Sequence, residues 1–142
     1  MKRILMIGTG GTIASEMGGD GLTPELTTEQ LLSFVPSVGK ECHVDCVQLY
    51  SLDSTSIEPK HWVGVAKTIQ EKYDDYDGFV ILHGTDTMAY SASVLSFMIE
   101  GLTKPVIFTG SQLPIGSPRT DGKENLISSV EIAAAKDGEG CP

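Results

Sequence analysis

Residues 3–15 have the sequence RILMIGTGGTIAS, an apolar run that passes directly into a turn with three glycines and two threonines. The apolar run has the length and composition of a buried strand. Glycine allows the chain to turn sharply and lets a substrate approach the backbone closely. The stretch therefore predicts a buried first strand with a site at its carboxyl end. It leaves open whether that site binds a phosphate or presents a threonine.

Three further apolar runs follow, and they alternate with stretches of helical periodicity. The expected strands are residues 3–8, 43–50, 78–82 and 105–108, and the expected helices are 28–35, 59–69, 87–99 and 122–136. Capping boxes at Thr27-x-x-Gln30 and Asp121-x-x-Glu124 mark two helix starts. This alternation predicts an α/β fold, with a doubly wound, mainly parallel sheet in a flavodoxin- or Rossmann-like three-layer arrangement.

Composition limits the partners and the compartment. A formal net charge of -9 opposes binding to nucleic acid. No apolar run approaches the roughly 20 residues that span a bilayer, so we expect no membrane attachment. The apolar run after Met1 is too short for a signal peptide, and we expect a cytoplasmic protein.

The cysteines and histidines indicate no metal site. The cysteines form no C-x-x-C pair, and the histidines lack H-E-x-x-H spacing; the residues are Cys42, Cys46, Cys141, His43, His61 and His83. We expect reduced structural thiols, no metal, and for His83 a packed position at the edge of the core.

Polar residues follow every expected strand. They are Thr9–Thr12, Ser51–Thr55, His83–Thr87 and Thr109–Gln112. Because parallel strands place their carboxyl ends at one edge of a sheet, these four loops are expected to converge. The sequence therefore predicts one site built from hydroxyl groups and two carboxylates.

The first loop lacks the residues that define the common phosphate-binding motifs. A G-x-G-x-x-G motif fails at Ile13, and the loop has no lysine for a P-loop. A flavodoxin-type loop, which is rich in Thr and Gly, matches the sequence more loosely and is the remaining phosphate-binding alternative. The other interpretation is a nucleophilic Thr12, whose hydroxyl needs a neighbour to take its proton. Thr85, Asp86 and Lys136 are the candidate helpers.

Each of these residues also has a purely structural explanation. Thr12 fits a turn, Thr85 and Asp86 fit a helix start, and Lys136 fits a helix end. Residues 53–55 fit an Asx-type turn. Taken singly, these explanations are the better ones, and only the joint occurrence favours a site.

That joint occurrence resembles the bacterial-type L-asparaginases. TGGTIA (9–14) and HGTDTMAY (83–90) look like the two signature segments of that family. LDST (52–55) and TGSQLPIGSPRTDGKENL (109–126) are similar to family sequence in the same order. Because the resemblance covers essentially all 142 residues, the chain is identified as the N-terminal catalytic α/β domain of such a two-domain enzyme.

The resemblance implies a cofactor-free amidohydrolase that converts L-asparagine to L-aspartate and ammonia, with L-glutamine as the alternative substrate. Thr12 matches the nucleophile that forms an acyl-enzyme, and Thr85 matches the second catalytic threonine. Asp86 matches the carboxylate that holds the α-ammonium group, and Lys136 matches the lysine coupled to them. The loop that binds the α-carboxylate and α-amino ends is matched by Asp53, Ser54 and Thr55.

The chain departs from the family pattern in two ways. The family usually has a tyrosine in a G-Y-x-P setting of a mobile loop, where this chain has Leu22 in GLTP. We expect the glycine-rich segment 16–24 to act as a flexible lid. Thr23 or another group of this segment is then left to replace the tyrosine. Family members are also more than twice as long. Their C-terminal domain, which completes the site of a neighbouring subunit in a homodimer or homotetramer, is absent here.

Two alternatives differ in role. An amide-hydrolysing subunit of a tRNA-dependent amidotransferase shares the threonine signatures but normally carries an extra N-terminal domain. An inactive truncated domain or an FMN-binding flavodoxin-like module is the other. Since the chain ends just after a helix, we expect a fragment that is feeble or inactive by itself.

Overall fold

A computed structural model describes residues 1–18, 21–24, 26–40 and 42–135, with the backbone alone for residues 17, 18 and 22–24. Its main sheet contains β1 (Lys2–Gly10), β4 (Cys42–Leu52), β5 (Gly78–Leu82) and β6 (Val106–Thr109). All neighbours pair in parallel, in the order β4-β1-β5-β6. The expected parallel α/β sheet is therefore confirmed.

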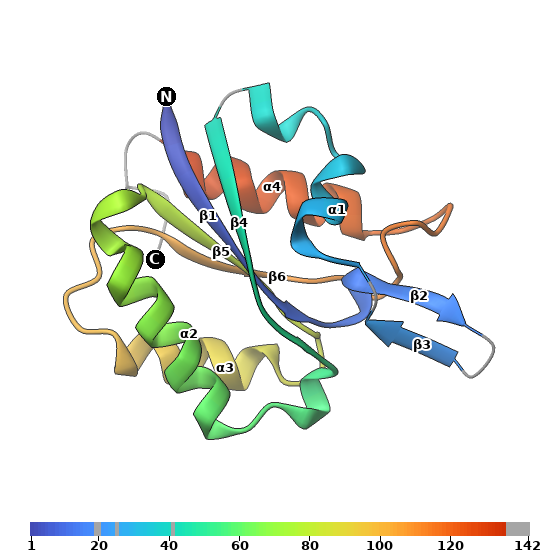
Figure 1. Cartoon of the computed structure of the whole chain (residues 1–142), viewed down its shortest axis with the longest axis horizontal. Helices are drawn as coiled ribbons and strands as arrows, with labels where there is room; N and C mark the ends of the chain where they lie inside the picture. Colours follow the sequence, from blue (N-terminus) through green and yellow to red (C-terminus); the bar gives the residue numbers. More distant parts are fainter. Residues whose placement is uncertain (19–20, 25, 41, 136–142) are drawn as a thin grey trace.

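Helices cover both faces of this sheet (Figure 1). One face packs against α1 (Thr28–Ser33) and α4 (Gly122–Ala134), and the other against α2 (Pro59–Lys72) and α3 (Met88–Met98). Side chains alternate along β1, so that Ile4 and Met6 join the first core and Leu5 and Ile7 the second. All four are 3% exposed or less, which explains why β1 is continuously apolar.

The strand order places a switch point between β1 and β5. The chain leaves β1 toward β4 on one side, and it leaves β5 toward β6 on the other. In open α/β sheets, ligands bind in the crevice that such a reversal opens at the carboxyl ends of the strands. The loops that follow Gly10 and Leu82 flank this crevice.

The first expected capping box is confirmed and the second is wrong. The Thr27 hydroxyl accepts from the Gln30 N–H at 3.2 Å, and the Gln30 side chain accepts from the Thr27 N–H at 2.7 Å. Asp121 precedes α4 but makes no side-chain cap bond, because its carboxylate turns to the loop before the helix. Helix α1 also ends at Ser33, earlier than expected.

Six short elements complete the part of the chain that the structure describes. Four are 3-10 turns, namely η1 (Thr12–Ala14), η2 (Val38–Lys40), η3 (Ser54–Ser56) and η4 (Tyr73–Asp75). The other two are β2 (Ser15–Gly18) and β3 (Gly21–Pro24), an antiparallel hairpin beside the main sheet (Figure 1). The sequence pattern predicts only a glycine-rich loop there, and its role as a lid stays a prediction.

Candidate active site

Two glycines turn the chain at the end of β1 and bring three loops into contact. Gly10 and Gly11 have φ values of +110° and +88°, which side chains rarely adopt. A Cβ atom on Gly11 would lie 2.5 Å from the amide nitrogen of Gly84, and one on Gly10 would overlap the backbone of Leu52. Only glycine therefore lets the loop after β1 touch the loops after β4 and β5.

The loops after β4 and β5 are held against each other in the same way. A Cβ atom on Gly84 would lie 2.6 Å from the Cβ of Ser54. The Thr87 hydroxyl donates to the carbonyl oxygen of Ser54 at 2.8 Å. The structure thus brings the loop of Asp53–Thr55 next to the loop of Thr85 and Asp86, as the sequence predicts.

Thr12 lies half-buried in η1, directly after Gly11. The turn is fixed by other atoms, because the Ser15 hydroxyl donates to the Gly11 carbonyl at 3.1 Å and the Ala14 N–H donates to it at 3.2 Å. Within the part of the chain that the structure describes, no side chain or backbone group bonds the Thr12 hydroxyl. Its side chain is therefore not used to hold the turn, and the hydroxyl is available for another partner.

Thr85 and Asp86 do not cap helix α3. The N-cap residue is Thr87, and the first turn of the helix contains no acidic residue. The Thr85 hydroxyl instead accepts from the side-chain amide of Gln112 at 3.3 Å, and the Asp86 side chain is exposed. The explanation of these two residues as helix caps is therefore wrong.

The Asx-type turn expected at Asp53 is confirmed. One carboxylate oxygen accepts from the Thr55 N–H at 2.9 Å and from the Thr55 hydroxyl at 2.8 Å. These bonds, the backbone one first, hold the pKa of Asp53 below its usual range. An ionised, exposed carboxylate therefore stands at the head of this loop.

His83 is a buried structural residue, as expected. Its Nδ1 lies 2.7 Å from the Gly84 carbonyl oxygen, which requires a proton on Nδ1. Its Nε2 then accepts from the Ser91 hydroxyl at 2.8 Å, and Ser91 accepts from the Trp62 indole N–H at 2.7 Å. Burial lowers the pKa of His83, which favours this neutral form.

Two further side chains, Thr87 and Gln112, shape the site. Both lie in loops that the sequence predicts to meet at this edge of the sheet, although neither is singled out there as a site residue. Lys136 lies outside the described residues, so its role stays a prediction.

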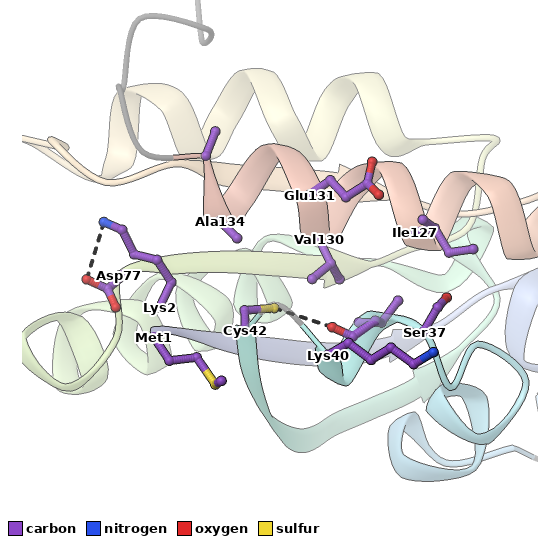
Figure 2. A pocket seen from close by; sticks show the side chains of 12 residues that line it. Met1, Lys2, Ser37, Lys40, Cys42, Asp77, Ile127, Val130, Glu131 and Ala134 are labelled. Carbon is purple, nitrogen blue, oxygen red and sulfur yellow. Dashed lines mark hydrogen bonds and ion pairs between the residues drawn. The ribbon is translucent and has the colours of Figure 1, made fainter.

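A hollow lies at the end of the sheet opposite the candidate site (Figure 2). It measures about 800 Å³, and it is lined at the amino ends of the strands by Met1, Lys2 and Asp77, with an apolar wall that includes Val130. Lys2 is paired with Asp77 at 3.6 Å. Because catalytic groups of α/β sheets gather at the carboxyl ends, this hollow is not the candidate active site.

No group of three or more His, Cys, Asp or Glu side chains within residues 1–18, 21–24, 26–40 and 42–135 is arranged to hold a metal ion. None of the helices described in that range is both long and apolar enough to cross a membrane.

Comparison with known proteins gives one consistent result. A family model described as "Asparaginase, N-terminal" matches residues 3–141. L-asparaginase 1 of Escherichia coli K12 is 44% identical over 137 residues, which are 94% of this chain and 40% of that protein. One subunit of the glutamyl-tRNA(Gln) amidotransferase of Saccharolobus islandicus is 40% identical over 135 residues, 93% of this chain and 30% of that protein.

Solved structures agree with the sequence matches. The thermostable L-asparaginase from Thermococcus kodakarensis superposes with a TM-score of 0.83 at 39% identity, over 93% of this chain and 40% of that one. The probable cytoplasmic L-asparaginase from Campylobacter jejuni gives 0.87 at 31% identity, over 97% and 41%. The chain thus spans about 40% of the length of these asparaginases, and it belongs to the asparaginase family, whose N-terminal domain it matches.

Proposed function

We propose that this site hydrolyses the side-chain amide of L-asparagine to give L-aspartate and ammonia, with Thr12 as nucleophile. The observation that carries the proposal is the half-buried Thr12 hydroxyl, which nothing in the described chain engages, held by glycines against the loop of Thr85 and Asp86. A hydroxyl that is spared from structural bonds at a strand switch point is placed to react with a bound ligand.

The reaction has two steps. The Thr12 oxygen attacks the amide carbon as its proton passes to a base; the base then gives this proton to the amide nitrogen, so that the C–N bond breaks, ammonia leaves and an aspartyl ester of Thr12 remains. Water then attacks the ester carbon as one of its protons passes through the base to the Thr12 oxygen, and the ester C–O bond breaks to release aspartate. Backbone N–H groups near Thr12 are proposed to stabilise the oxyanion of each step; the Gly11 N–H is not one of them, because it donates to the Leu52 carbonyl at 3.0 Å. Lys136 is the proposed base, and we propose that it acts together with Thr85.

The remaining residues fit the two charged ends of an amino acid. The exposed carboxylate of Asp86 is proposed to pair with the α-ammonium group. The loop of Asp53, Ser54 and Thr55 is proposed to bind the α-carboxylate end, with the Ser54 hydroxyl as donor, because the Thr55 hydroxyl already donates to Asp53 at 2.8 Å. Such charge-assisted bonds are roughly twice as strong as neutral ones, which suits recognition of a zwitterion.

The proposed site needs no cofactor, because the nucleophile and the charged binding groups all belong to the chain. Since the asparaginases it matches are much longer, we expect slow turnover from these 142 residues alone. Ammonia release from L-asparagine, with a Thr12→Ala variant beside the unchanged chain, tests the proposal. Loss of release in the variant supports Thr12 as nucleophile, and an unchanged rate refutes that role.

A second candidate is supported by the match to the glutamyl-tRNA(Gln) amidotransferase over 93% of the chain. In that role the same site would release ammonia for transfer to a tRNA-bound acceptor. Because this second role differs in how the ammonia is used, assays with L-asparagine and L-glutamine, each with and without charged tRNA, separate the two. Release that depends on tRNA favours the second candidate, and release without it favours the first.

A further inference from the structure

The loop between β6 and α4 is anchored by the carboxylate of Asp121. That carboxylate accepts from the Gln112 N–H at 2.9 Å and from the Leu113 N–H at 3.1 Å. It receives a further bond at 3.3 Å from the side-chain amide of Asn125, which also donates to the Gly110 carbonyl at 2.9 Å. Residues at the start of α4 therefore hydrogen-bond to the loop backbone on both sides of Ser111, at Gly110 and at Gln112.

Gln112 links this anchor to the candidate active site. Its backbone is held by Asp121, and its side-chain amide donates to the Thr85 hydroxyl at 3.3 Å. The side chain of Gln112 is itself exposed, so few other contacts restrict where its amide points. Thr85, Gln112, Asp121 and Asn125 also line one open hollow of about 430 Å³.

We propose that Asp121 is a positioning residue for Thr85, because its carboxylate fixes the Gln112 backbone and thereby aims the Gln112 amide at the Thr85 hydroxyl. The relevance to catalysis rests on the proposed function, in which Thr85 is the second threonine. The hydrogen-bond chain itself does not depend on turnover. A short carboxylate is well suited to this task, because its two oxygens accept two neighbouring backbone N–H groups at once.

The charge of Asp121 supports the same role. Burial raises the pKa of this carboxyl, but the bonds from Gln112, Leu113 and Asn125 outweigh burial and leave it below the usual range. Asp121 is thus ionised at neutral pH and accepts from both backbone groups. An asparagine in its place would direct an amide N–H at one of them.

The test uses the purified 142-residue chain and NMR resonances of the Thr85 methyl group and the Gln112 side-chain amide. The variants are Asp121→Ala, Asp121→Asn and Gln112→Ala, with Glu124→Ala as the matched control. Glu124 is an exposed acidic residue in the first turn of the same helix. Circular dichroism establishes that each variant is folded.

We expect both Asp121 variants to shift the Thr85 methyl resonance in the same direction as Gln112→Ala, whereas Glu124→Ala leaves it in place. Combining Asp121→Asn with Gln112→Ala should add no further shift, because the two residues act through one chain of bonds. An unchanged Thr85 resonance in folded Asp121→Asn, or shifts that simply add in the double variant, would overturn the proposal. Ammonia release is measured separately, so failure of the proposed function leaves this result interpretable.

Discussion

Gly11 and Gly84 lie so close that a single Cβ atom on Gly11 would be 2.5 Å from the Gly84 amide nitrogen. Thr12 directly follows the first glycine and Thr85 the second. The contact therefore sets how the two threonines face the crevice between β1 and β5. The atoms that a Cβ on Gly11 would overlap are backbone atoms of the other loop, so the overlap cannot be relieved by a change of side-chain rotamer.

Alanine at Gly11 should destabilise the fold. The overlap with Gly84 costs about 1–3 kcal/mol by overpacking. The backbone of Gly11, with φ 88° and ψ 174°, adds about 1–3 kcal/mol because this region is almost restricted to glycine. Urea unfolding measures the change. Gly39→Ala is the control, because a Cβ atom there meets nothing within 4 Å. Equal stability of the two variants would contradict the proposed close contact.

Ser91→Ala should cost about 1–3 kcal/mol, because it leaves both the half-buried Trp62 N–H and the buried His83 Nε2 without their partner. Ser93→Ala on the same helix is a matched control, since the Ser93 hydroxyl is exposed and bonds only the carbonyl one turn before it. The free energies of unfolding of both variants decide the point. A loss of similar size at Ser93 would mean that the buried network contributes nothing specific.

The stability of the chain should fall as the pH drops below about 6.5, the usual pKa of histidine in an unfolded chain. Because burial depresses the pKa of His83 in the folded state, the unfolded state binds the proton first and is favoured at acidic pH. Above that pH both states are neutral at His83, and the full stability is present. The slope for one proton is at most about 1.4 kcal/mol per pH unit.

The free energy of unfolding, measured between pH 5 and 8, gives this slope. This pH range lies above the range in which carboxylates such as Asp53 titrate. His83→Gln should flatten it, whereas His43→Gln removes an exposed ring and leaves His83 in place. A slope that survives in His83→Gln would show that another group is responsible.

Asp86→Asn should raise KM for L-asparagine by about 10-fold or more with a smaller change in kcat. The reason is that a carboxylate bound to the α-ammonium group holds substrate and transition state alike. Steady-state ammonia release gives both constants. Asp74→Asn, which changes an exposed carboxylate in η4, is expected to alter neither. A fall in kcat alone for Asp86→Asn would assign this residue to the chemistry instead of to binding.

Much of the fold could be predicted because its signals are local. The apolar runs of β1 and β5 and the capping box at Thr27 each specify an element within a few residues. The β2–β3 hairpin was missed because its short strands, Ser15–Gly18 and Gly21–Pro24, give no sustained alternation of apolar and polar side chains. The cap predicted at Asp121 is wrong because the spacing of residues does not reveal that the backbone N–H of Gln112, in the preceding loop, takes the carboxylate instead.

The candidate site followed from topology more than from individual residues. Once four parallel strands are assigned, the loops with Thr12, Ser54 and Thr85 must meet at one edge. The link from Gln112 to Thr85 could not be foreseen, because it depends on side-chain orientation across 27 residues of sequence. The match to the family over residues 3–141 supports the joint interpretation but leaves each residue's role to experiment.

The most direct test of the account is ammonia release from L-asparagine by the purified chain and by Thr12→Ala, at concentrations where one turnover per chain is detectable. L-asparaginase 1 of Escherichia coli serves as the positive control. The account predicts slow release by the unchanged chain and a loss of about 10³-fold or more, down to the buffer rate, in Thr12→Ala. Release that exceeds the buffer rate and is the same from both proteins would contradict Thr12 as the nucleophile.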